Sequence, residues 1–169
     1  LQEAIERKLE KMVQQNPLRL AFYEKYKQII EDYNKGKDLQ SVQLAFDRFQ
    51  EVLQGLTEEE SRAILEGLDE ETLAIFDLLR KSSLSKKERE EVKKVAVKTL
   101  ATLKKEKLRI ERWRESTQVT AQVKTIIIDN LQWLPKEAYA DDEVDEKTDL
   151  VYQHVYSNYS GGVMNVFMQ

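Results

Sequence analysis

Hydrophobic side chains recur at intervals of three and four residues along nearly the whole chain, which is the spacing of one face of an α-helix. In the first segment Ile5, Leu9 and Met12 follow this spacing. The pattern predicts helices over residues 1–14, 17–34, 38–54, 57–67, 70–81, 85–114, 118–134 and 143–159. We therefore expect an all-α fold, an irregular multi-helix bundle of about seven to eight helices that includes one long basic helix.

Two of these helices have apolar stripes that we expect to face the core. The helix over residues 17–34 should bury Leu20, Tyr23, Tyr26, Ile30 and Tyr33. The helix that follows it should bury Leu39, Val42, Phe46, Phe49 and Leu53.

Residues that favour helix starts stand at two of the predicted boundaries. Asn16 precedes Pro17, which is the order of an N-cap residue and a first-turn proline. Ser85 is followed three residues later by Glu88, which predicts a capping box at the start of the long basic helix.

We expect a helix break near residue 55. Gly55 would end the third helix, and Thr57 with Glu60 would form a capping box that opens a short fourth helix.

One segment is ambiguous between helix and strand, because residues 125–128 form a β-branched run. The sequence offers no second strand with which it could pair. We therefore predict that residues 118–134 are helical and that Pro135 stops the helix.

Composition agrees with a helical protein, since 169 residues contain 5 Gly and 2 Pro and 34% of the residues are charged. The chain has no cysteine, which excludes disulfides and thiolate metal sites. It has no signal peptide and no apolar run long enough to span a membrane, so we expect a cytoplasmic location and no membrane partner. It begins at Leu1 without a Met, and we interpret it as a piece of a longer polypeptide.

Charge is unevenly distributed along the chain. Residues 81–114 hold 13 Lys and Arg against 5 Asp and Glu, whereas the remainder holds 14 basic and 26 acidic residues. On one straight helix, the basic residues sharing a face are Lys87, Lys94, Lys98, Lys105, Arg109 and Arg112. This stripe would be about 37 Å long. Either the two parts neutralise each other within the fold, or the stripe meets duplex DNA or an acidic protein.

Motifs that carry chemistry are absent from the sequence. It contains no phosphate-binding loop, no dinucleotide-binding glycine motif and no nucleophile elbow. His154 is the single histidine, and the carboxylates of Asp141, Asp142 and Glu143 lack the spacing of a calcium loop. We therefore predict no catalytic, cofactor-binding or metal-binding residue in this chain.

Three aromatic residues are candidates for a protein interface. Tyr152 and Tyr156 have the spacing of one helix face, and Trp133 lies near the end of the preceding helix. Aromatic residues are enriched at protein–protein contacts, although aromatic residues at helical spacing also serve as core. Both interpretations stay open at this point.

Four blocks of sequence together resemble one known family. They are NPLRLAFYEKYKQIIEDYNKG (16–36), LTEEESRAILEGLDEETLAIFDLL (56–79), LSKKEREEVKKVA (84–96) and DLVYQHVYSNY (149–159). In this order they resemble the C-terminal helical region of the R (restriction and motor) subunit of type I restriction enzymes. The resemblance rests on helix-face patterns and includes no catalytic signature.

The resemblance implies a non-catalytic assembly domain over residues 1–159, followed by a flexible tail over 160–169. Such a domain would dock the ATP-driven motor and nuclease of its own parent chain onto the modification (methyltransferase) subunit. The resemblance also implies that ATP and magnesium belong to the parent complex and that this domain binds no cofactor. The alternative is a helical module that binds duplex DNA without sequence specificity through the basic stripe.

Overall fold

The computed structural model describes residues 2–36, 38–162 and 167, so most of the predicted tail lies outside the described residues. Within these ranges the chain forms seven α-helices and two 3-10 helices and no strand, which confirms the all-α prediction. The fold comprises two compact units, Leu1–Asp69 and Glu70–Gln169. This division does not test the prediction of one assembly domain over residues 1–159, because one domain can hold two such units.

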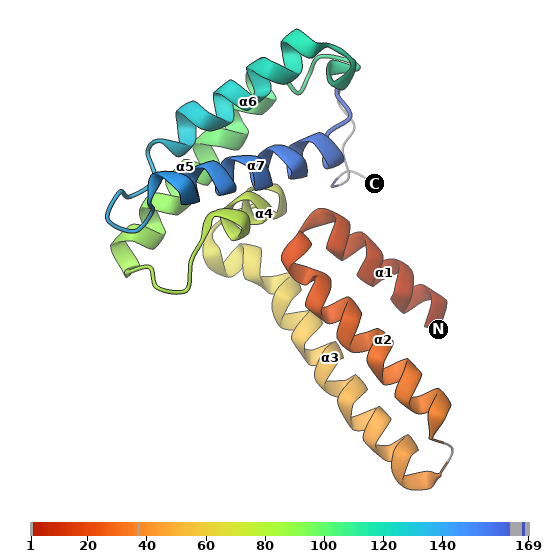
Figure 1. Ribbon diagram of the computed structural model, residues 1–169. Helices are drawn as coiled ribbons and strands as arrows, with labels where there is room; N and C mark the ends of the chain where they lie inside the picture. Colours follow the sequence, from red (N-terminus) through yellow and green to blue (C-terminus); the bar gives the residue numbers. More distant parts are fainter. Residues whose placement is uncertain (1, 37, 163–166, 168–169) are drawn as a thin grey trace. The chain divides into compact units, whose positions relative to one another are not determined.

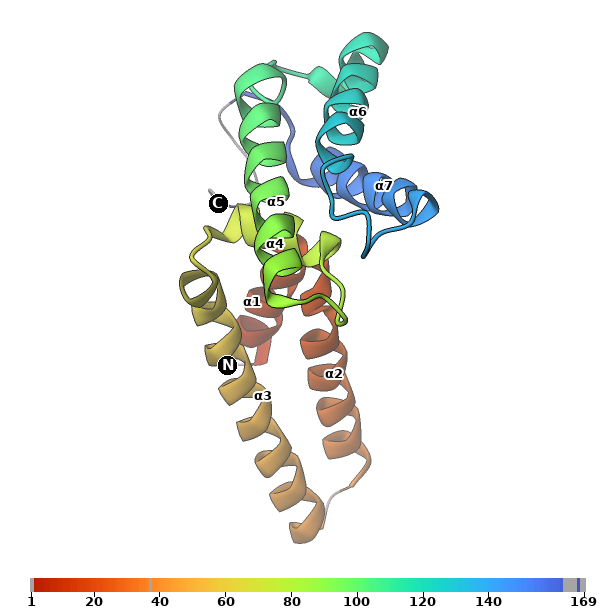
Figure 2. The ribbon, with the colours of Figure 1, turned by 90° about the vertical axis from the view of Figure 1, so that its left-hand side faces the viewer.

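The first unit contains α1 (Gln2–Gln15), the 3-10 helix η1 (Pro17–Arg19), α2 (Leu20–Lys35) and α3 (Leu39–Glu66). Figures 1 and 2 both show α2 and α3 as an antiparallel pair, with α1 running beside α2. Its buried cluster comprises Leu9, Met12, Tyr26, Ile29, Ala45, Val52 and Leu56. The cluster is therefore built from one face of each helix.

The predicted N-cap at Asn16 is confirmed. The Asn16 side chain is fully buried, and its Oδ1 accepts a 3.1 Å hydrogen bond from the backbone N–H of Leu18. Pro17 occupies the first turn, as predicted, but that turn is 3-10 and the α-helix proper begins at Leu20. The cap satisfies a backbone donor that would otherwise be left unpaired at a buried chain reversal.

The predicted break near Gly55 is wrong, because α3 is continuous for 28 residues. Thr57 lies inside the helix and its hydroxyl donates to the carbonyl oxygen of Leu53 at 3.0 Å, so it caps nothing. Gly55 has a packing role instead. A Cβ atom there would stand 2.9 Å from Cε1 of Phe22 on α2, so glycine permits the two helices to approach closely.

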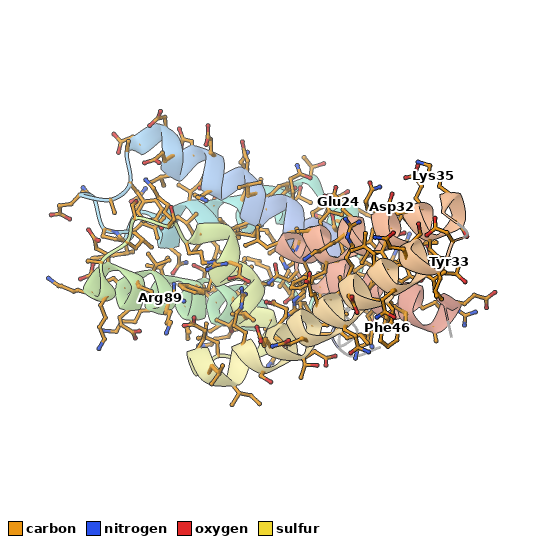
Figure 3. All side chains as sticks on the ribbon, turned by 90° about the horizontal axis from the view of Figure 1, so that it is seen from below. Glu24, Asp32, Tyr33, Lys35, Phe46 and Arg89 are labelled. Carbon is orange, nitrogen blue, oxygen red and sulfur yellow. The ribbon has the colours of Figure 1, made fainter. Side chains whose placement is uncertain are left out.

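The predicted core face of α3 is wrong for four of its five residues, since only Phe49 packs against the buried cluster. Leu39, Val42, Phe46 and Leu53 are exposed, and the buried residues of the helix are Ala45, Val52, Leu56 and Ala63. On α2, Leu20 and Tyr33 are exposed too, while Tyr26 is buried as predicted. The face of α3 that joins the buried cluster is thus the neighbouring one, through Ala45, Val52 and Leu56. Figure 3 labels Tyr33 and Phe46 on these two helices.

The second unit contains α4 (Glu70–Leu79), α5 (Lys86–Glu106), the 3-10 helix η2 (Trp113–Glu115), α6 (Thr117–Leu131) and α7 (Asp141–Asn158). Helix α4 packs against α5 and α7, α5 packs against α6, and α6 packs against α7. Every residue from 72 to 79 is buried, so α4 is the central helix of the unit. The β-branched run 125–128 lies in α6, which confirms the helical interpretation.

The long basic helix begins as predicted but ends early. Ser85 Oγ accepts from the N–H of Glu88 at 3.3 Å, and Glu88 Oε2 accepts from the N–H of Ser85 at 2.7 Å, which is a complete capping box. The helix ends at Glu106 and not near residue 114. At its end the backbone N–H groups of Lys107 and Leu108 both donate to the carbonyl oxygen of Leu103. Arg112 then adopts a left-handed φ of 54°, and the chain turns into η2.

Helix α7 begins at Asp141, two residues before the predicted start at residue 143. Asp141, Asp142 and Glu143 therefore occupy its first turn, where carboxylates complement the helix dipole. The Glu143 side chain also accepts a 2.9 Å hydrogen bond from the N–H of Ala140. Of the two hydrogen bonds of a capping box, only this one forms here, because the alanine at the N-cap has no side-chain oxygen to accept the other.

Candidate interaction surfaces

All six residues of the predicted basic stripe are exposed. Lys87, Lys94, Lys98 and Lys105 lie on α5, whereas Arg109 and Arg112 follow its end and do not continue its face. The stripe on the helix is thus about 27 Å long at 1.5 Å per residue, not the predicted 37 Å.

Three lysines of this stripe form an uninterrupted positive row, namely Lys94, Lys98 and Lys105, which we call the α5 lysine row. Glu91, which falls on the same face, lies 3.9 Å from Lys87 and offsets that residue. Within the described residues, no carboxylate lies within 4 Å of any side-chain nitrogen of the row. The α5 lysine row is therefore a positively charged surface without neighbouring negative charge in the described part of the chain.

Other lysines of the same basic segment are held inside the second unit. Lys81 Nζ donates to the carbonyl oxygen of Ala138 at 2.7 Å and to Glu143 at 2.6 Å. Lys104 bonds Glu71 at 2.6 Å. The basic segment is consequently divided, with part of its charge neutralised within the fold and the α5 lysine row left at the surface. Neutralisation within the fold is thus confirmed for Lys81 and Lys104, whereas a contact of the exposed lysines with DNA or an acidic protein stays a prediction.

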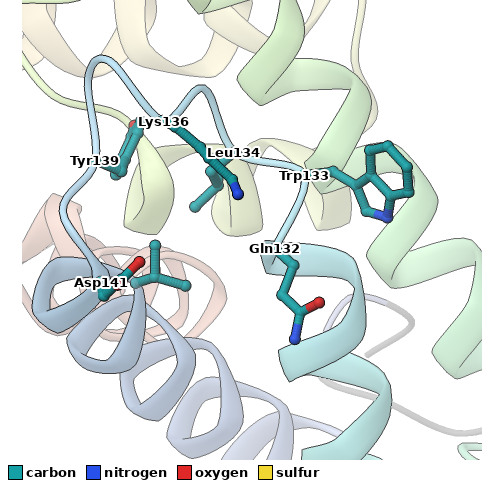
Figure 4. A pocket seen from close by; sticks show the side chains of 7 residues that line it. Gln132, Trp133, Leu134, Lys136, Tyr139 and Asp141 are labelled. Carbon is teal, nitrogen blue, oxygen red and sulfur yellow. The ribbon is translucent and has the colours of Figure 1, made fainter.

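Lys98 and Trp133 come together in the structure, although they were predicted to serve different surfaces. The Lys98 ammonium nitrogen lies 5.6 Å from the centroid of the Trp133 ring. The indole is 72% exposed. Figure 4 shows it projecting away from the loop that carries Leu134 and Lys136. A large aromatic side chain so open to water, beside a cation without a carboxylate partner, makes this place a candidate interaction surface.

A pocket of about 520 Å³ adjoins Trp133 and is lined by Gln132, Trp133, Leu134, Lys136, Tyr139, Asp141 and Val144. Tyr139 is buried, and its hydroxyl donates to the carbonyl oxygen of Leu79 at 2.7 Å. Burial raises the pKa of Tyr139 to about 12, so the phenol stays protonated at neutral pH. Tyr139 therefore fixes the loop to α4 and offers no acid–base chemistry there.

Tyr152 and Tyr156 form a second aromatic cluster on α7. Their ring centroids are 6.0 Å apart, and Tyr156 also meets the buried Trp113 edge-on at 5.7 Å. Arg114 lies over Tyr156 and Lys124 lies over Tyr152. Across the described part of the chain, no ring contact joins Trp133 to either tyrosine. The three predicted interface residues thus belong to two places.

His154 is buried on α7, and its Nδ1 lies 3.1 Å from Nδ2 of Asn158. Its Nε2 has no hydrogen-bond partner among the described residues. Burial lowers the pKa of His154 to about 4, so the ring is neutral at pH 7. No group of three His, Asp or Glu residues in the described ranges could hold a metal ion.

The apolar side chains on the open face of α3 were missed as a surface and assigned to the core. We call Leu39, Val42, Phe46 and Leu53 the α3 stripe. The signal was present in the sequence, because these residues alternate at three and four residues beside a second row of small side chains that includes Ala45 and Ala63. The sequence therefore carries two adjacent apolar rows on this helix, of which α2 covers one.

No helix in the described part of the chain is long and apolar enough to cross a membrane. Residues 1–159 match the family described as Type I restriction enzyme HindI endonuclease subunit-like, C-terminal. No curated protein and no solved structure matches the chain.

Proposed function

Because the chain belongs to the family of C-terminal domains of type I restriction enzyme R subunits, we propose that it is a docking module of the cytoplasmic complex. In this role it joins the motor and nuclease parts of its R subunit to the modification subunit. The module itself makes and breaks no bond, and it requires neither ATP nor magnesium to bind.

The observation that carries this proposal is the α3 stripe. Its side chains are 86% (Leu39), 39% (Val42), 56% (Phe46) and 37% (Leu53) exposed. Exposed apolar area costs about 25 cal/mol per Å², so a row of four large side chains is expensive to leave in water. Contiguous apolar surface of this kind typically marks a contact with another macromolecule.

The spacing of the stripe fits a partner helix. Leu39, Phe46 and Leu53 are seven residues apart, and Val42 lies between the first two, as in the seam of a coiled coil. The seam runs parallel to the buried row of the same helix. A partner helix could therefore pack on α3 without disturbing α2.

The edge of the stripe favours a protein over a nucleic acid. The residues that share this face are Gln43, Gln50 and Thr57, all uncharged and exposed. Gln43 donates to Asp47 at 2.9 Å, and Arg48 pairs with Asp32 at 3.0 Å farther out. An apolar centre with a polar rim is the usual composition of a protein–protein interface.

Tyr152 and Tyr156 stay predictions for a second contact with the same partner, whereas Trp133 lies apart from them beside Lys98. Tyr156 is 38% exposed and Tyr152 is half-buried against it. Their exposed area is smaller than that of the α3 stripe. The stripe is therefore the first surface to test.

The test measures binding of the tagged chain to purified modification subunit by calorimetry, without ATP, magnesium or DNA. We expect a dissociation constant in the micromolar range or below. The double variant Phe46→Asp/Leu53→Asp should weaken binding at least about tenfold, since interface anchors contribute more than about 1 kcal/mol each. Leu150→Asp, at a 48% exposed position on α7, is the matched control and should bind normally.

Two results would overturn the proposal. One is the absence of binding at micromolar concentrations of a chain whose circular dichroism is helical. The other is unchanged binding by the Phe46→Asp/Leu53→Asp variant. In the second case, loss of binding in Tyr156→Ala would assign the contact to α7 in place of α3.

A further inference from the structure

We propose that the α5 lysine row and Trp133 form a binding surface for single-stranded nucleic acid. In this arrangement the lysines contact successive phosphates and one unpaired base stacks on the indole. The surface lies wholly within the second unit. It is independent of the α3 stripe in the first unit.

The first argument is charge complementarity. Lys94, Lys98 and Lys105 are exposed on one face of α5 and have no carboxylate within 4 Å among the described residues. Lysines elsewhere in the segment, such as Lys81 and Lys104, are paired with Glu143 and Glu71. The fold thus neutralises some lysines and leaves this row able to bind anions.

The length of the row suits a polyanion. Lys94 and Lys105 are eleven residues apart, which is about 16 Å along the helix axis. A stacked nucleic acid strand advances about 3.4 Å per nucleotide, so the row spans about five phosphates. Ala101 is the small residue between Lys98 and Lys105 on this face, so no large side chain separates a strand from the helix.

The second argument is the Trp133 ring. Its exposed surface beside Lys98 offers a flat π face, and the 5.6 Å separation keeps the ammonium next to whatever stacks there. A stacked base therefore brings its own phosphate within reach of Lys98. The bases of a duplex are already stacked on each other, so only an unpaired base can use the indole in this way. The adjoining pocket of about 520 Å³ leaves room beside the ring.

An acidic protein is a poorer fit to the row. Protein interfaces need apolar anchors at their centre, and between Lys94 and Lys105 the exposed apolar residues of α5 are Ala101 and, at the side of the row, Val97, neither of them aromatic. Trp133 stands at the side of the row, beside Lys98. A strand whose backbone follows the lysines and whose base meets the indole uses both features at once.

The experiment measures fluorescence anisotropy of labelled oligodeoxythymidylate, oligodeoxyadenylate and a random duplex with the full chain, from about 50 mM to about 200 mM salt. Tryptophan emission is followed in parallel. The chain has two tryptophans, and Trp113 is fully buried, so quenching by the oligonucleotides reports on Trp133. We expect both single strands to bind, to quench, and to dissociate as salt rises.

Two variants separate the parts of the surface. Lys94→Gln/Lys98→Gln/Lys105→Gln should reduce the magnitude of the salt slope by about 2, at about 0.7 per lost contact. The matched control is Lys25→Gln/Lys27→Gln/Lys35→Gln on α2, which removes the same charge and should leave the slope unchanged. Trp133→Ala should weaken single-strand binding about 5- to 150-fold and leave duplex binding unchanged.

Several outcomes would reject the proposal. They are the absence of single-strand binding at about 50 mM salt, equal losses in the two lysine triple variants, and an equal effect of Trp133→Ala on single strands and duplex. Binding of the single strands without quenching would instead identify a phosphate contact that does not involve the indole. It would likewise reject the single-strand surface.

Discussion

The indole nitrogen of Trp113 donates a 2.7 Å hydrogen bond to the backbone carbonyl of Tyr159, 46 residues away in the sequence. The hydroxyl of Tyr159 in turn bonds Glu71 at 3.0 Å, and Glu71 also accepts from Lys104 at 2.6 Å. The connection therefore ties η2, the end of α7, α4 and α5 to one another. It accounts for the turn after α5, because the chain must leave the helix to place Trp113 in the core.

Trp113→Phe should lower the free energy of unfolding by about 2–4 kcal/mol. The change leaves a buried carbonyl without its donor and opens a small cavity. Urea unfolding followed by far-ultraviolet circular dichroism measures the loss. Trp133→Phe, at the 72% exposed position, is the control and should change stability by less than about 0.5 kcal/mol. Equal stability of the two variants would contradict the role assigned to the hydrogen bond.

Gly161→Ala should be more destabilising than Gly67→Ala. Both residues have positive φ, at 99° and 69°. A Cβ atom at Gly161 would stand 2.3 Å from the carbonyl oxygen of Ile110, whereas nothing lies within 4 Å of one at Gly67. The free energy of unfolding of the Gly67 variant should fall by about 1 kcal/mol, because alanine is strained in the left-handed region. It should fall by more in the Gly161 variant, because the backbone at Ile110 must also move. Comparing thermal unfolding of the pair isolates the close approach of residue 161.

Acid should destabilise the protein through His154. The folded pKa of about 4 lies below the ordinary value of 6.5, so the unfolded chain takes up a proton that the folded chain resists. The contribution of His154 to the free energy of unfolding is fully present above pH 6.5. It falls as the pH drops toward 4, by up to about 1.4 kcal/mol per pH unit.

The measurement for His154 is the free energy of unfolding at several pH values between 7 and 5. This window lies above the titration of Asp38, Glu88 and Glu143, whose pKa values are lowered by their hydrogen bonds. Because the chain has one histidine, His154→Gln should flatten the profile in this window. A slope that persists in the variant would show that another group titrates.

Arg19→Met should cost about 3 kcal/mol, whereas Lys8→Met should cost less than about 1 kcal/mol. Arg19 bonds Glu59 at 2.9 Å with side chains 3% and 11% exposed, but Lys8 bonds Glu60 at 2.6 Å with both side chains about half exposed. Losing Arg19 leaves the buried Glu59 carboxylate with only the longer, 3.6 Å ion pair to Arg62. Adding Glu59→Leu to Arg19→Met should therefore recover part of the loss in urea unfolding, and a further loss would contradict this account.

Sequence signals for helix starts were reliable, because a cap is formed by residues within one turn of each other. The Asn16 cap and the Ser85–Glu88 capping box were predicted because each satisfies backbone donors of the next turn, an interaction that needs no distant partner. The helical interpretation of residues 118–134 also held, because residues 2–36, 38–162 and 167 contain no strand for them to pair with.

Signals that depend on packing were misread. Gly55 was predicted to end a helix, but it accommodates the Phe22 ring inside one. The apolar spacing of Leu39, Val42 and Phe46 predicted a buried face, whereas α2 packs on the neighbouring row that contains Ala45 and Val52. Both errors have the same origin, since a periodic pattern shows that a helix has apolar faces but does not show which face a neighbour covers.

The sequence alone determined the all-helical class, most helix starts and the excess of positive charge in residues 81–114, because these follow from side-chain periodicity, capping and composition. Tertiary structure decided which lysines are paired internally, where α5 ends and that Lys98 meets Trp133. These outcomes depend on contacts between residues far apart in the chain. Their energies are set by close packing and desolvation in three dimensions, which no local pattern contains.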